Sequence, residues 1–175
     1  MITEYNIIFT TCYNREIINF YFTDCNISDI SQIHPRSCSA STEYDDRYNC
    51  DNVYDGLLSG YAASWATRGE QVGAWIQINL DSVYTLMKLM ARGRSSSERF
   101  KSITLEFLDD STKDFTLSED QNTVWNEIVL SHMPISNYVK ITANTVYGGS
   151  NIGFREVKIF GCFTGKIAFL GFNGT

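Results

Sequence analysis

Proline, histidine and basic residues are scarce in this chain of 175 residues. Two prolines and two histidines leave no material for a proline-rich linker and little imidazole for catalysis. The 14 lysines and arginines are outnumbered by 20 aspartates and glutamates, which gives a formal charge of -6. Nucleic-acid binding needs a basic face, and anionic lipid attracts basic segments, so neither nucleic acid nor a membrane is expected as a partner.

The sequence also lacks a membrane-spanning run and a recognisable secretory leader. No segment approaches the roughly 20 apolar residues that a bilayer-crossing helix needs. The first ten residues include Glu4 and no basic residue, and polar residues interrupt their apolar run, unlike a signal peptide. These absences predict a cytoplasmic protein.

Five cysteines are present, and no two form a Cys-x-x-Cys pair, so a zinc knuckle is not expected. An odd number cannot pair fully within one chain, which favours reduced, half-buried thiols in the cytosol. The alternative is an extracellular domain with one or two disulfides. The triplets Asn26-Ile-Ser28 and Asn173-Gly-Thr175, which have the pattern of glycosylation sites, fit that alternative.

Motifs for catalysis are missing as well. The chain has no nucleophile elbow, His-Glu-x-x-His motif, phosphate-binding loop or dinucleotide fingerprint. The glycine-rich stretch at residues 147–151 lies between two predicted strands and is explained by a hairpin turn. We therefore expect a protein that is not an enzyme.

The chain does contain many short runs of alternating apolar and polar residues. Hydrophobic residues make up 43% of the chain and aromatic residues 14%, and aromatic side chains favour strands. No segment keeps the spacing of an amphipathic helix. The runs predict strands at residues 75–80, 86–90, 103–108, 114–117, 123–129, 138–143 and 154–160. Short strands separated by turns predict an all-β, antiparallel jelly-roll sandwich.

Two flanks differ from this central region. Residues 1–24 are apolar and aromatic and could form an arm or extra strands. Residues 163–175 form an apolar tail, which could be an edge strand of the same domain or a segment buried against a partner. The predicted docking residues of the tail are Phe163, Ile167, Phe169, Leu170 and Phe172.

Several segments of the central region occur in the order and at the spacing of one known family. These segments are Asn52–Gly56, Ser64–Gly69, Ala74–Leu80, Ala91–Arg94, Phe100–Thr112, Asn137–Thr142 and Asn151–Cys162. Together they resemble the discoidin domain, also called the coagulation factor 5/8 C-type or galactose-binding-like domain. The resemblance covers about residues 25–162, and the fold of the family is a jelly-roll sandwich. The segments also resemble the intraflagellar-transport member of the family.

The resemblance implies a binding module and suggests a structural Ca²⁺ site. The positions that match the family's calcium site are Asp55, in an Asp-Gly turn, and Glu156, in the last strand. Carbonyl groups near Asn52 and Ser59 would complete the shell, because Ca²⁺ takes six to eight oxygen ligands. The alternative is that Asp55 belongs to an ordinary turn and Glu156 pairs with a surface cation.

Ligand-contacting residues are expected among loop aromatics and arginines. Arginine forks suit carboxylates, phosphates and sugar hydroxyls, although Arg92 and Arg94 could equally tie strands to loops. Loop aromatics could supply a stacking surface for a sugar. The candidates are Tyr44, Tyr48, Tyr54, Tyr61 and Trp65. Tyr61 and Trp65 are the two that we predict to contact the ligand.

The leading hypothesis is an intracellular protein-interaction component of a larger assembly, either cytoskeletal or ciliary. The missing leader, the odd number of thiols and the apolar flanks favour it. The alternative hypothesis is a calcium-dependent, carbohydrate-binding lectin-like domain, with a glycan as its partner.

Overall fold

The computed structural model describes residues 25, 27–60, 62–94 and 98–164. These residues form an antiparallel β-sandwich of the jelly-roll type, as predicted. The N-terminal arm and most of the predicted docking tail lie outside the described residues. The elements in chain order are η1 (Ile27–Asp29), β1 (Ser31–Ile33), β2 (Ser37–Ala40), η2 (Asp46–Tyr48), η3 (Cys50–Val53), β3 (Trp75–Gly93), β4 (Arg99–Glu106), β5 (Thr112–Thr116), β6 (Asn126–Val129), β7 (Ile135–Gly148) and β8 (Phe154–Phe163).

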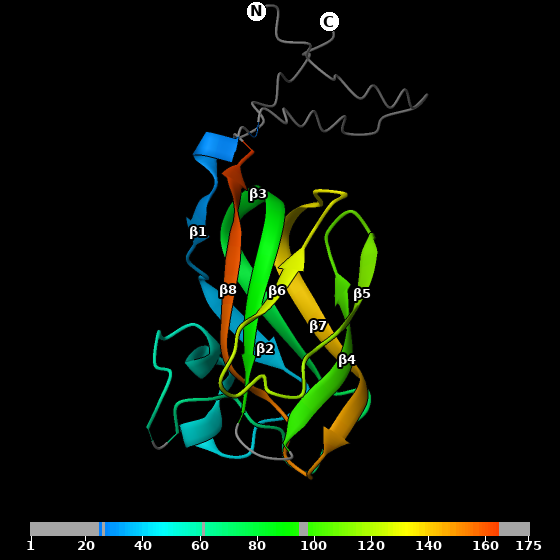
Figure 1. Ribbon diagram of the computed structural model, residues 1–175. Helices are drawn as coiled ribbons and strands as arrows, with labels where there is room; N and C mark the ends of the chain where they lie inside the picture. The colour runs from blue at the N-terminus through cyan, green and yellow to red at the C-terminus, as the bar shows by residue number, and fades with distance from the viewer. Residues whose placement is uncertain (1–24, 26, 61, 95–97, 165–175) are drawn as a thin grey trace, which may run out of the picture.

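Strand β3 connects the two layers of the sandwich. It bends through an irregularity between Asn79 and Tyr84, and Figure 1 shows its two halves in different layers. The first half pairs with β2 and β7, and β7 continues the layer to β4 and β5. The second half pairs with β6 and β8, and β8 continues to β1. Because the two layers share one strand, they enclose a single core.

The core lies between the layers and follows the alternation of the sequence. Ile76 and Ile78 of β3 and Ile103 of β4 are completely buried. At one end of the sandwich the Phe100 ring stacks on Phe154, with their centroids 4.4 Å apart. Among the described residues, no helix is long and apolar enough to cross a membrane.

The loops at one end of the sandwich are long. Residues 41–60 and 62–74 lie between β2 and β3 there, and the β5–β6 and β7–β8 connections lie at the same end (Figure 1). The end of β8 lies at the opposite end, where a disulfide joins its Cys162 to Cys25. We call the end with the long loops the loop end. Phe163, placed in the tail by the sequence prediction, is the last residue of β8 and pairs with Tyr84.

Candidate functional site

Backbone hydrogen bonds tie the long β2–β3 connection to the start of β8. The Trp65 amide donates to the Phe154 carbonyl at 3.0 Å, and the Thr67 amide donates to Ile152 at 2.8 Å. The Trp65 side chain is completely buried and stacks near Phe100. Its indole N–H donates to the Thr42 carbonyl at 3.0 Å. The prediction that Trp65 contacts a ligand is therefore wrong, because its ring belongs to the core.

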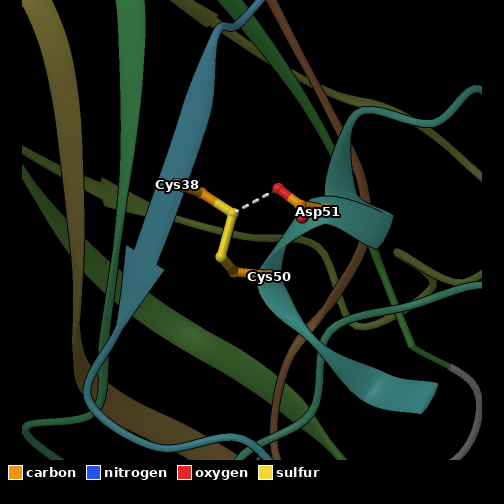
Figure 2. Close-up of side chains that lie close together, drawn as sticks. All are labelled: Cys38, Cys50 and Asp51. Carbon is orange, nitrogen blue, oxygen red and sulfur yellow. Dashed lines mark hydrogen bonds between the residues drawn. A yellow bond between two sulfur atoms is a disulfide. The ribbon is translucent and has the colours of Figure 1, made fainter. Parts of the chain in front are cut away.

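A disulfide between Cys38 of β2 and Cys50 of η3 also anchors this connection (Figure 2). A second disulfide joins Cys25 to Cys162 of β8, and the Cα atoms of the two pairs are 5.9 and 5.7 Å apart. The prediction of reduced thiols is wrong for these four cysteines, whereas Cys12 lies outside the described residues. The fold brings the two cysteines of each disulfide together, and their spacing in the sequence does not show this.

The disulfide lies beside the Asp51 carboxylate, as Figure 2 shows. Asp51 Oδ1 is 3.2 Å from Cys38 Sγ, and Tyr54 donates its hydroxyl hydrogen to the same carboxylate oxygen. Two cysteines and an acid within reach of one another resemble a metal site. Metal ions bind thiolates, however, and a disulfide supplies none. This cluster therefore fixes η3 to β2.

The loop end contains a hollow of about 220 Å³. Tyr44 and Tyr48 come from the β2–β3 connection, Arg94 and Glu98 from the ends of the β3–β4 connection, and Asn151 from the β7–β8 connection. We call this hollow the loop-end pocket. It combines two aromatic rings with a cation, a carboxylate and an amide.

Several contacts hold the aromatic wall of the loop-end pocket. The rings of Tyr44 and Tyr48 meet edge to face with centroids 5.9 Å apart, and Tyr44 is 43% exposed. Arg68 donates two hydrogen bonds to the Tyr44 carbonyl, at 3.0 and 2.7 Å. Asp45 caps η2 by accepting from the Arg47 amide at 2.9 Å, which fixes the turn that carries Tyr48. The wall is thus formed before any ligand binds.

Arg94 forms the polar side of the loop-end pocket. Its guanidinium carbon lies 5.4 Å from the centre of the Tyr48 ring. One guanidinium nitrogen is 3.0 Å from Glu98 and 2.5 Å from the Asn151 carbonyl. The Asn151 side-chain oxygen accepts from the Gly69 amide at 3.0 Å. A guanidinium and a carboxylate held beside aromatic rings can bind a ligand with both hydroxyl groups and apolar faces.

The other predicted ligand residues are not brought together. Arg92 donates its Nε hydrogen to the Asn122 carbonyl at 3.1 Å, which supports its alternative role of tying a strand to a loop. Tyr61 lies outside the described residues. Sequence analysis missed Glu98 and Asn151 because isolated polar loop residues carry no pattern. The only signal was their position beside the arginine and glycine-rich segments.

The structure places Glu156 against the turn that carries Asp55, and the Asp55 carboxylate accepts a hydrogen bond from the Leu57 amide at 2.7 Å within that turn. Glu156 is 2% exposed and accepts a hydrogen bond from the Gly56 amide at 3.2 Å. Burial raises the pKa of Glu156 to about 7, and the neighbouring Asp55 carboxylate adds to the increase. Arg155 donates to the Leu58 carbonyl at 2.8 Å and so holds the loop that follows Asp55.

Asp55 and Glu156 are the acids in this region that could hold a hard cation. A buried carboxylate close to a second carboxylate is destabilised when charged, and a bound cation would relieve both effects. Asp55 and Glu156 would hold Ca²⁺, together with carbonyl oxygens of the loop. The Asn52 amide donates to the carbonyls of Arg47 and Ser64, and Ser59 is exposed. Roles for Asn52 and Ser59 at the ion stay predictions.

The chain belongs to the family described as a domain of unknown function, DUF7402, whose model matches residues 31–160. A search of the curated proteins finds no match. Many solved structures share its galactose-binding-like fold. The comparisons give no support to the likeness to the intraflagellar-transport member.

Three of these structures indicate the range of the fold. The family 32 carbohydrate-binding module (CBM) from C. perfringens NanJ, in complex with galactose, has a TM-score of 0.59 and 15% identity over 76% of this chain and 94% of that one. The lectin-binding domain of Lectinolysin, a His 62 mutant complexed with Lewis b, has a TM-score of 0.58 and 16% identity, over 71% and 91% of the two chains. The f-lectin (fucolectin) from Morone saxatilis (striped bass) serum has a TM-score of 0.61 and 14% identity, over 75% and 49%.

Proposed function

We propose that this protein is a non-catalytic carbohydrate-binding domain and that the loop-end pocket holds its sugar. The observation that carries the proposal is the exposed Tyr44 ring beside the fixed Arg94–Glu98 pair. Sugar rings have apolar C–H faces that pack on aromatic rings, and their hydroxyls pair with forked charged groups. Neighbours with this fold were solved with galactose and Lewis b, which supports a glycan as the ligand.

The alternative sequence hypothesis therefore has more support than the leading one. The protein-scaffold hypothesis depended partly on free thiols, and two disulfides replace four of them. Disulfides persist in oxidising compartments and are rare in the cytosol. We accordingly propose that the domain works outside the cytosol, where extracellular glycans are available. Docking through the tail stays a prediction.

Calcium has a structural role in this proposal. Asp55 and the amide of Gly56 lie in the same long connection that carries Tyr44 and Tyr48, whereas Glu156 lies in β8. An ion shared by Asp55 and Glu156 would fix that connection to the sheet, and so stabilise the loop end without contacting the sugar.

Replacing Tyr44 by alanine tests the proposed pocket. We expect Tyr44→Ala to weaken binding of glycans that end in galactose or fucose by about tenfold or more, the loss expected for one sugar-stacking ring. Binding is measured on a glycan array and then by calorimetry with the glycan that binds. Stability should barely change, because the ring is partly exposed.

Phe163→Ala provides the matched control. Phe163 is also an exposed aromatic residue, at 56%, but it lies at the opposite end of the sandwich. This variant should bind as the unchanged protein does. If no glycan on the array binds the unchanged protein, or if both variants lose affinity equally, the loop-end pocket is not a sugar site.

A further inference from the structure

A second polar surface crosses the outer face of the sheet that contains β2, the first half of β3, β7, β4 and β5. Cross-strand partners form one row: Ser39 opposite Gln77, Gln77 opposite Lys140, Lys140 opposite Glu106, and Glu106 opposite Thr112. The residues on either side of this row, such as Ile76, Ile141 and Leu105, are buried in the core. Because side chains alternate along a strand, the row points away from the core.

The length of this row suits a chain and exceeds a single sugar. Neighbouring strands are about 4.8 Å apart, so four steps across five strands span about 19 Å. Each step is close to the length of one sugar ring in an extended polysaccharide. The row therefore offers one polar group for each successive unit of a ligand that lies across the strands.

The row leads into a hollow of about 300 Å³ at the end of the sheet formed by the β4–β5 connection. The residues that line it are Gln77, Lys140, Glu106, Thr112, Tyr138, Ser111, Phe107 and Asp110. We call it the sheet-face hollow. In Figure 1 the β4–β5 connection lies at the end opposite the long loops, so this hollow is separate from the loop-end pocket.

Hydrogen bonds fix the walls of the sheet-face hollow. Tyr138 donates its hydroxyl hydrogen to the Phe107 carbonyl at 3.1 Å, which holds its ring against the β4–β5 connection. The amide of Leu108 donates to Ser136 Oγ at 2.9 Å, and the amide of Asp110 donates to Phe107 at 3.2 Å. A connection held this way is largely formed before a ligand binds, as is usual for small-molecule sites.

The charges of the sheet-face hollow disfavour an anionic ligand, because Asp110 adds a negative charge beyond the Lys140–Glu106 pair. Lys140 Nζ lies 2.7 Å from Glu106 Oε2, so the two charges of the row compensate each other. Around them stand an amide, hydroxyls and a phenol ring, which together offer hydrogen-bond donors and acceptors beside an apolar surface. Sugar hydroxyls need both kinds of partner. A docked peptide would instead need apolar side-chain pockets or a free strand edge.

We propose that the sheet-face hollow and its polar row bind the interior of an extended, neutral polysaccharide chain. This inference rests on the proposed function only for the chemical class of the ligand, because the residues and the end of the sandwich are different. The loop-end pocket would take a terminal sugar, and the sheet face a stretch of chain. Two sites on one domain would raise its avidity for a polysaccharide surface.

Thr112→Trp tests this proposal by filling the hollow. Thr112 is exposed on the edge strand β5, where tryptophan is well tolerated, so the variant should fold. The probes are neutral hexasaccharides of glucose, mannose, xylose and galactose, and binding is followed by amide NMR shifts. At least one should move the amides of Gln77, Glu106 and Lys140, and Thr112→Trp should weaken that binding by about tenfold or more.

Thr116→Trp is the matched control, because Thr116 is exposed on the same strand but does not line the hollow. It should bind like the unchanged protein, whereas Gln77→Ala should weaken binding. If none of the four hexasaccharides moves these amides, or if Thr112→Trp and Gln77→Ala both bind normally, the sheet-face proposal is overturned. Neither result affects the test of the loop-end pocket, which is read from Tyr44→Ala and terminal galactose or fucose.

Discussion

Replacing Cys25 and Cys162 together by alanine should lower the free energy of unfolding by about 5 kcal/mol, the largest change expected for any variant considered. This disulfide joins the start of the described domain to its last strand over a sequence separation of 137 residues. In the chain-entropy model, a cross-link stabilises the native state by restricting the unfolded chain, and the effect grows with loop length. Urea unfolding followed by tryptophan fluorescence measures the change.

The double variant Cys38→Ala/Cys50→Ala is the comparison. Its disulfide spans 12 residues, so the expected loss is smaller, about 3 kcal/mol. It should also weaken binding in the loop-end pocket, since η3 directly follows the turn that carries Tyr48. Equal stability of the unchanged protein with and without a dithiol reductant would contradict both expectations.

The strands could be predicted because burial imposes a two-residue period on this sequence. The apolar residues Ile76, Ile78 and Leu80 alternate with Gln77 and Asn79, and the three apolar side chains are buried as predicted. The sequence interpretation ended one strand at residue 80 and began another at 86. In the structure β3 continues through this stretch, because a register irregularity breaks the pattern of side chains and not the strand.

The candidate sites were predicted less completely, because loops bring them together. Arg94 was identified from its chemistry, but its partners Glu98 and Asn151 belong to different connections. Trp65 was misassigned because its segment looks like a loop in sequence, although backbone bonds to the start of β8 draw it into the core. The pairing of Cys25 with Cys162 is a property of the fold and cannot be read from spacing.

Glu156 should make the stability of the calcium-free protein fall as the pH rises. Its pKa is about 7 in the folded protein and has an ordinary value of 4.5 without burial. The folded state therefore holds this proton more tightly, and the stabilisation is present below about pH 4.5 and lost as the pH rises through about 7. Because solvent screens part of the effect, we expect a loss of about 2 kcal/mol between about pH 5 and 8. Thermal unfolding in a chelator measures it.

Glu156→Gln should remove this pH dependence, because the amide never ionises. In a chelator at about pH 8 the variant should be more stable than the unchanged protein, whereas Glu127→Gln, at an exposed acid, should change little.

Millimolar Ca²⁺ should then raise the unfolding temperature of the unchanged protein and not that of Glu156→Gln, because an ion that binds only the folded state stabilises it by mass action. If the stability depends on pH but Ca²⁺ does not raise the unfolding temperature, Glu156 is a buried carboxyl group and the proposed calcium site is wrong. A calcium response that survives in Glu156→Gln would place the ion elsewhere. Only the loss of both effects in this one variant assigns the proton and the metal to the same carboxylate.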